Sequence, residues 1–96
     1  MKLVWRAKAE SDRKKAIQSI ADKNVGAAIS QLDEIECQID LRIDQPEIGR
    51  PGRTDRTREL VISRTSFIVI YRVHQNIEQV EILRLVHGAQ KWPPKS

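Results

Sequence analysis

The side chains of this chain that could do chemistry are mostly arginines, and they are unevenly placed. Residues 1–45 carry eight basic and eight acidic side chains, whereas residues 46–96 carry nine basic against five acidic ones. Such an excess suits an anionic partner, either nucleic acid or an acidic protein segment, although it also serves solubility alone in many small domains. The basic residues of the second half are Arg50, Arg53, Arg56, Arg58, Arg64, Arg72, Arg84, Lys91 and Lys95.

Three apolar segments predict the strands that would position these arginines. They cover Glu59–Ser63, Phe67–Val73 and Val80–Val86, and short polar breaks separate them. β-branched and aromatic residues at this density predict an antiparallel meander of three strands. The middle strand is apolar on both faces, so it needs cover on both sides.

A predicted register would bring charged residues together at one end of the sheet. A three-residue loop at Arg64–Ser66 places Arg58 opposite Arg72, and a turn at His74–Asn76 places Arg72 opposite Glu78. Two neighbouring arginines are unfavourable unless an anion lies between them. The group is therefore a salt bridge at the rim or a cationic site for a carboxylate or phosphate. The same register places on one face Leu60, Ile62, Ile68, Ile70, Val80 and Ile82.

The first half of the chain predicts one strand and two helices. Lys2–Arg6 is a short apolar segment typical of a strand, and the stretch from Ala7 to about Asp22 has helical spacing. Asn24 is a candidate N-cap for a second helix, which Pro46 would end. Because the connection is short, the two helices should pair as an antiparallel hairpin. The apolar stripe of the second helix is Val25, Ala28, Ile29, Leu32, Ile35, Ile39 and Ile43.

The expected fold class is α+β, in the order β-α-α-β-β-β, with the helical hairpin packed on one face of an antiparallel sheet. Gln45–Asp55 is rich in proline and glycine and is expected to be a loop. Residues 1–96 are expected to form a single domain. The sheet face opposite the hairpin would lack cover from the chain itself. This predicts a partner, either an amphipathic helix, an added strand or a second copy of the chain.

Several features point to the cytoplasm. No stretch is apolar enough to span a membrane, no membrane partner is expected, and the charged start of the chain does not fit a signal peptide. The single cysteine, Cys37, excludes an internal disulfide and fits a reducing compartment as a plain helix residue. No cofactor and no metal is expected. Trp92 is expected to fold back over the core edge, and His74 to be solvated in a turn.

Four segments of the chain form one set in a fixed order: IGRPGR (Ile48–Arg53), TREL (Thr57–Leu60), FIVIYRV (Phe67–Val73) and EILRLVHGAQKWP (Glu81–Pro93). Taken together, these segments resemble the RelE/ParE toxins of type II toxin–antitoxin modules. The resemblance implies a compact RelE/ParE-like toxin of the plasmid-stabilisation type, neutralised by a cognate antitoxin whose C-terminal segment folds on binding. It also implies that the toxin meets operator DNA only through the antitoxin complex.

The family contains RelE-like members that cut mRNA at the ribosome and ParE-like members that poison DNA gyrase. RNA cleavage needs a base, a cation for the phosphate charge and an acid for the leaving oxygen. Compared with the nuclease pattern, Glu59 and Val61 replace two lysines and Ile68 replaces an arginine. Ala89 and Gln90 also stand where basic residues are usual. The resemblance therefore favours a ParE-like inhibitor of DNA gyrase.

One nuclease match remains. His87 stands where another nuclease branch keeps a histidine, and it would act as a general acid or base with Arg58 and Arg84 on the phosphate. This defines the alternative, a ribosome-dependent endoribonuclease (mRNA interferase), unless His87 is only a strand-end residue. A degenerate member that only binds its antitoxin is a third reading. The expected nucleic-acid or anion contacts are Arg50, Arg53, Arg56, Arg72 and Lys91. The expected antitoxin contacts are Leu60, Ile62, Ile68, Ile70 and Trp92.

Overall fold

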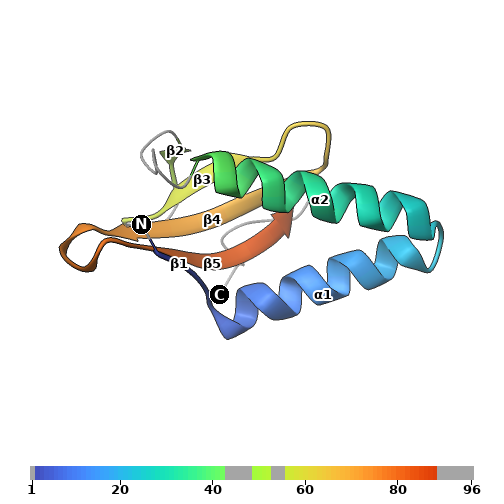
Figure 1. The fold of residues 1–96 in the computed structure, drawn as a ribbon, viewed down its shortest axis with the longest axis horizontal. Coiled ribbons are helices and arrows are strands. Elements are labelled where there is room, and N and C mark those ends of the chain that lie inside the picture. Colours follow the sequence, from blue (N-terminus) through green and yellow to red (C-terminus); the bar gives the residue numbers. More distant parts are fainter. Residues whose placement is uncertain (1, 43–48, 53–55, 89–96) are drawn as a thin grey trace.

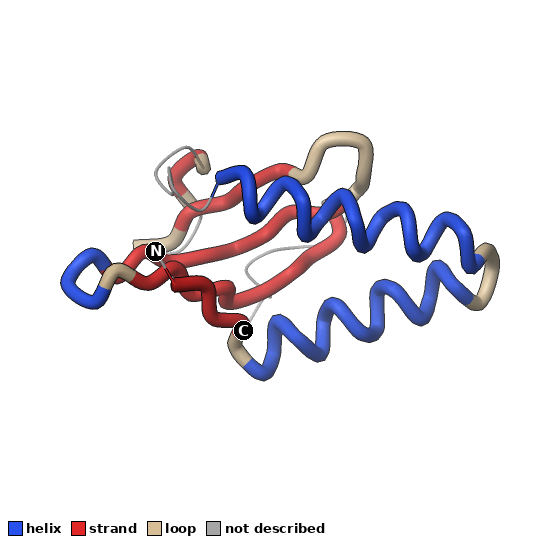
Figure 2. Tube along the Cα trace, in the orientation of Figure 1, coloured by secondary structure: helices blue, strands red, loops and turns tan. Residues whose placement is uncertain are grey.

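The computed structural model describes residues 2–42, 49–52 and 56–88. The strands form one sheet in the order β1-β5-β4-β3-β2. The helical hairpin packs on one face of the sheet, and its loop end projects beyond the strands (Figures 1 and 2). The elements are β1 (Lys2–Trp5), α1 (Ala7–Ala21), α2 (Val25–Arg42), β2 (Arg50–Pro51), β3 (Arg58–Val61), β4 (Phe67–His74), the 3-10 helix η2 (Gln75–Ile77) and β5 (Gln79–His87).

The predicted α+β class is confirmed, and so are the first strand, both helices and the three later strands. Two details of the predicted sheet are wrong. β1 pairs with β5 in parallel, so the sheet is mixed and not antiparallel. Arg50–Pro51, which was predicted as loop, forms the edge strand β2 against β3. An edge position suits Pro51, because the open side of the strand needs no donor. The predicted end of α2 at Pro46 lies outside the described residues.

Both predicted registers are wrong. The Ile62 N–H donates to the carbonyl of Phe67, so the β3–β4 loop is one residue longer than predicted. The hydroxyl of Thr65 donates to the Ile62 carbonyl at 2.9 Å and stabilises this longer loop. Arg58 consequently faces Tyr71. A further register shift at Ile70/Tyr71 separates the two halves of the β4–β5 pair. Because side chains alternate along a strand, such slips move residues to the opposite face.

The observed pairing divides the predicted apolar face between the two sides of the sheet. We call the side covered by the helices the hairpin face and the opposite side the outer face. The hairpin face carries Leu60, Ile62, Phe67, Val69, Tyr71, Val80, Ile82 and Leu85, which pack with Ala9, Ile35 and Ile39 of the helices. The outer face carries Glu59, Val61, Ile68, Ile70, Arg72, His74, Glu81, Arg84 and Val86.

The outer face is less open than predicted. Ile70 and Val86 have exposures of only 0% and 2%, so the expectation of a face without cover is wrong for them. The expectation of an uncovered face is correct at Val61, which is 49% exposed, and in part at Ile68, which is half-buried. The apolar area that a partner can reach is therefore the part of this face nearest β3.

The projecting end of the hairpin explains a second error in the predicted core. Val25 and Ile29 were assigned to the buried stripe of α2, yet they are 62% and 58% exposed. They lie in the first turns of α2, at the loop end that extends past the sheet (Figure 1). The predicted N-cap is confirmed, because the Asn24 Oδ1 accepts a hydrogen bond from the Ala27 N–H at 3.0 Å. Cys37 is an exposed helix residue, as predicted. Within the described residues, no helix is long and apolar enough to cross a membrane.

Candidate functional site

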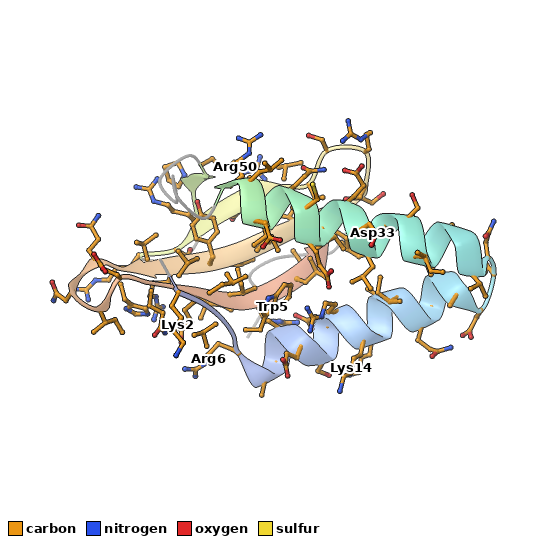
Figure 3. The ribbon with its side chains drawn as sticks, viewed as in Figure 1. Lys2, Trp5, Arg6, Lys14, Asp33 and Arg50 are labelled. Atoms are coloured by element: carbon orange, nitrogen blue, oxygen red, sulfur yellow. The ribbon has the colours of Figure 1, made fainter. Side chains whose placement is uncertain are left out.

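Charged side chains form a row across the outer face. At one edge, the Arg50 guanidinium donates two hydrogen bonds to the Glu59 carboxylate, at 3.2 and 3.0 Å. At the other edge, Glu81 accepts hydrogen bonds from Arg6 Nη1 at 2.9 Å and from His74 Nε2 at 3.1 Å. The side chains of Glu59 and Glu81 are only 2% and 10% exposed. Figure 3 shows Arg50 and Arg6 at opposite edges of the sheet.

His74 has a structural role that the sequence did not indicate. It ends β4 and bonds Glu81, so its predicted place as a solvated turn residue is wrong. The pKa of the Glu81 carboxyl lies below its ordinary value, chiefly because the His74 hydrogen bond stabilises the anion. Arg6 acts in the same direction, and burial of the carboxyl opposes both. The His74–Glu81–Arg6 group thus ties β4 and β5 to the end of β1.

We expect this group to make the stability of the fold depend on pH. Because the folded-state pKa of Glu81 is lowered, its contribution is complete above the ordinary glutamate value and is lost as the pH falls through the folded-state value. Urea unfolding between pH 6 and pH 3 should therefore give a flatter pH profile for Glu81→Gln than for the natural chain. Glu78→Gln, at the exposed adjacent turn, is the control and should keep the natural slope. Equal slopes for all three proteins would contradict the assignment.

Arg72 lies in the middle of the charged row. Its Nε is buried and has no hydrogen-bond partner among the described residues. It faces Glu81 across the β4–β5 pair, not Glu78 as predicted. Arg58 lies on the hairpin face, and Glu78 is exposed in the turn before β5. The predicted group of Arg58, Arg72 and Glu78 is therefore not formed.

Two of the three predicted catalytic residues lie at separate points of the sheet. Arg58 begins β3 opposite Tyr71, and its Nη1 donates to the carbonyl of Gly49 at 3.1 Å. His87 ends β5 opposite Phe67 and contacts that ring edge to face, with 5.8 Å between centroids. Since Phe67 and Tyr71 are four residues apart on β4, the backbones of Arg58 and His87 are separated by at least about 13 Å.

The third predicted catalytic residue, Arg84, is engaged in an ion pair. Its Nε and Nη2 donate to the two carboxylate oxygens of Asp12 on α1, at 2.7 and 3.1 Å. The side chains of Arg84 and Asp12 are 14% and 15% exposed, respectively. Asp12 also accepts the backbone N–H of Leu85 at 3.0 Å. Arg84 thus fastens α1 to β5. The contact lies in the part of β5 that continues beyond the last residue paired with β1.

The structure also shows a feature that the sequence analysis missed. The Arg13 guanidinium lies over the Trp5 ring, 4.3 Å from its centroid. Both residues line a cavity of about 180 Å³ between β1 and the helices, together with Leu3, Glu36, Ile39 and Asp40. Trp5 is one of two tryptophans in a chain poor in aromatic residues, which is the signal that was available in the sequence.

The other predicted contact residues are divided among several places. Leu60 and Ile62 lie on the hairpin face, whereas Ile68 and Ile70 lie on the outer face. Arg56 borders a cavity at the start of β3. Three predicted contact residues lie outside the described part of the chain: Arg53, Lys91 and Trp92.

Comparison with solved structures defines the class of fold. The chromosomal ParDE toxin–antitoxin system from P. aeruginosa matches with a TM-score of 0.80 and 24% identity, over 91% of this chain and 95% of that one. The toxin–antitoxin complex RelBE2 from Mycobacterium tuberculosis matches with a TM-score of 0.58 and 17% identity, over 90% and 95%. The chain therefore shares the fold of these two toxin–antitoxin structures.

Sequence comparison then identifies the family. The sequence profile for the ParE toxin of the type II toxin–antitoxin system parDE matches residues 3–92. Y4kP of Sinorhizobium fredii, a provisionally named toxin, is 39% identical over 67 residues, which are 70% of this chain and 67% of that protein. The chain belongs to the ParE toxin family and is a ParE-like toxin of a type II toxin–antitoxin system.

Proposed function

We propose that this toxin inhibits DNA gyrase by binding it, without chemistry of its own. The observation that supports this most is the separation of the three residues that a ribonuclease would need together. Arg58 and His87 lie far apart along the sheet, and Arg84 is committed to Asp12. General acid–base catalysis requires groups within hydrogen-bond reach of one reacting phosphate.

The outer face offers features that a binding inhibitor needs. Val61 is an exposed apolar side chain, Ile68 pairs with it on the same face, and Arg72 of the charged row lies further along β4. Exposed apolar patches often mark protein–protein interaction sites, and arginine is enriched among the residues that dominate the affinity of such interfaces. We propose that gyrase is bound through this part of the outer face.

We also propose that a cognate antitoxin neutralises the toxin in the cytoplasm. The two structural relatives described above are toxin–antitoxin assemblies, which supports such a partner. Of the predicted antitoxin contacts, Leu60 and Ile68 are half-buried and accessible, whereas Ile62 and Ile70 are 0% exposed. Leu60 borders an apolar cleft with Leu3 under the end of α2. An antitoxin segment that covers this cleft would bury both leucines.

The gyrase proposal is tested by adding the purified toxin to a supercoiling reaction and to a translation mixture. We expect cleaved DNA complexes with gyrase and intact mRNA. Val61→Asp should weaken the gyrase effect by about tenfold or more, because it places a charge at an apolar contact. Leu41→Asp is the matched control, since Leu41 is 73% exposed on α2 and should leave the effect unchanged.

Two results would contradict this proposal. Codon-dependent mRNA cuts that disappear in His87→Ala would favour the endoribonuclease. Absence of both effects, together with tight antitoxin binding, would identify a degenerate member that only binds its antitoxin.

A further inference from the structure

β1 forms one edge of the sheet and has a neighbouring strand, β5, on one side only (Figure 1). The N–H groups of Lys2 and Arg6 donate to carbonyl groups on the β5 side, at 2.8 and 2.9 Å. Because backbone groups alternate in direction along a strand, the N–H and carbonyl groups of Leu3 and Trp5 point away from β5. Within the described residues, these four groups have no hydrogen-bond partner. We call this side of the strand the β1 edge.

A cavity of about 180 Å³ lies beside the β1 edge. The side chains of Leu3 and Trp5 line it from the hairpin face, where both also pack against the core. The Arg13 guanidinium lies 4.3 Å from the centroid of the Trp5 ring, and its Nη1 is 3.8 Å from the Glu36 Oε1. Among the described residues, the helices contribute to the lining Arg13, Glu36, Ile39 and Asp40.

The described charges of this cavity leave an excess of negative charge. Arg13 contributes one positive charge, whereas Glu36 and Asp40 contribute two negative ones, so their sum is −1. Asp40 is exposed on α2 and forms no ion pair with any residue that the structure describes. Because Arg13 already lies between Trp5 and Glu36, the carboxylate that remains available to a further cation is that of Asp40. The cavity therefore favours a cationic group.

We propose that the β1 edge binds an extended segment of a partner protein as an added antiparallel strand, and that an arginine or lysine of this segment enters the cavity toward Asp40. Segment residues opposite Leu3 and Trp5 exchange backbone hydrogen bonds with them and direct their side chains to the hairpin face. The segment residue between these two lies opposite Val4, on the outer face. The cation belongs opposite Leu3, because Arg13 already occupies the Trp5 end of the cavity.

A second copy of the chain fits the β1 edge less well. Antiparallel pairing of two β1 strands that uses both Leu3 and Trp5 is centred on Val4, so Lys2 of each copy lies opposite Arg6 of the other. Both side chains are exposed, and like charges directly opposite one another are destabilising. Charged residues at the ends of an edge strand also oppose unspecific pairing. The edge therefore suits a different chain.

The proposal is tested with an acetylated heptapeptide that alternates threonine and valine around a central arginine, added to the full chain. Its control contains citrulline, which has the shape of arginine without the charge. We expect the arginine peptide to slow amide hydrogen exchange at Leu3 and Trp5 and to bind about tenfold more tightly than the control. Asp40→Asn should remove this preference. Asp33→Asn should keep it, because Asp33 is exposed on α2 but does not line the cavity.

Methylation of single peptide nitrogens separates strand addition from a contact through charge alone. In an antiparallel added strand, the N–H of the peptide arginine points toward β1, whereas the N–H of the next threonine points away. N-methylation of the arginine should therefore weaken binding by about tenfold or more, since it removes a donor and places a methyl group at the strand contact. N-methylation of the next threonine should leave binding nearly unchanged.

Several results would overturn the proposal. They are unchanged exchange at Leu3 and Trp5 with the arginine peptide, equal binding of the citrulline peptide, and equal effects of the two N-methylations. Slow exchange of these amides in the protein alone that disappears on dilution would identify a second copy at the β1 edge and would also overturn it. Val61→Asp should leave peptide binding unchanged, because β4 and β5 lie between β1 and β3. A chain that binds the peptide without affecting gyrase would contradict the function proposed above and support this site.

Discussion

Replacing Asp12 by alanine should lower the free energy of unfolding by about 3 kcal/mol, the largest effect that we expect from a single polar substitution in this chain. The change removes a bidentate carboxylate from Arg84 in a setting where both side chains are about 15% exposed. It also removes the acceptor of the Leu85 N–H. Removing one partner of a buried ion pair strongly destabilises a protein, because the charge that remains is desolvated and has lost its counter-ion.

Urea unfolding followed by circular dichroism measures this effect. Asp33→Ala is the matched control, because Asp33 is an exposed residue on α2 and its loss should cost under about 0.5 kcal/mol. In a double-mutant cycle, Asp12→Ala and Arg84→Ala should couple by more than about 1 kcal/mol. Additive effects would mean that Arg84 is not held by Asp12. Arg84 would then be available for phosphate, as the nuclease interpretation requires.

Gln38→Leu should destabilise the protein by about 2 to 3 kcal/mol, although leucine has a similar volume and is more hydrophobic. The Gln38 amide is 9% exposed and bonds both backbone groups of Ser63 at 2.8 Å. It fastens α2 to the loop that follows β3, through the same pair of backbone bonds that a neighbouring strand would make. Leucine would leave the N–H and carbonyl of Ser63 without these partners. The free-energy cost of leaving a donor or acceptor unsatisfied is larger than the net stability that one hydrogen bond contributes.

Gln38→Glu separates the hydrogen bonds from the packing. The introduced carboxylate still accepts the Ser63 N–H but faces the Ser63 carbonyl and Glu34. Its destabilisation should shrink as the pH falls from 7 toward 5, because a protonated carboxyl regains a donor. Gln18→Leu, which removes one exposed bond to Asp22, should cost under about 0.5 kcal/mol. A similarly small loss for Gln38→Leu would contradict the proposed link between α2 and β3.

The helices and strands were predictable because the signals that specify them are local. The apolar spacing after Ala7 and the cap at Asn24 predicted α1 and the start of α2 to within a residue or two. The strand register was not predictable, because it depends on turns with an unusual composition. Arg64 and Glu78 have positive φ values of 65° and 49°. Glycine and asparagine normally mark such positions, so the sequence carried no sign of these turns.

The candidate site could not be assembled from the sequence for a related reason. The pairs that organise it join residues very far apart, such as Arg6 with Glu81 and Arg84 with Asp12, at separations of 75 and 72 residues. Spacing rules report neighbours on one helix or one strand pair and say nothing about such partners. The resemblance to a family supplied the class of protein, while the roles of individual arginines required the fold.

The parallel pairing of β1 with β5 affects how the toxin emerges during its synthesis. Lys2–Trp5 aligns with Gln79–Ile82, so β1 has no partner strand until β5 has been synthesised and has left the ribosome. Pairing between residues so far apart in the sequence is slow, and the apolar strand of the growing chain stays exposed until it pairs. The outer face proposed above as the gyrase contact carries residues of β4 and β5, so we expect it to be complete only after β5 has been synthesised.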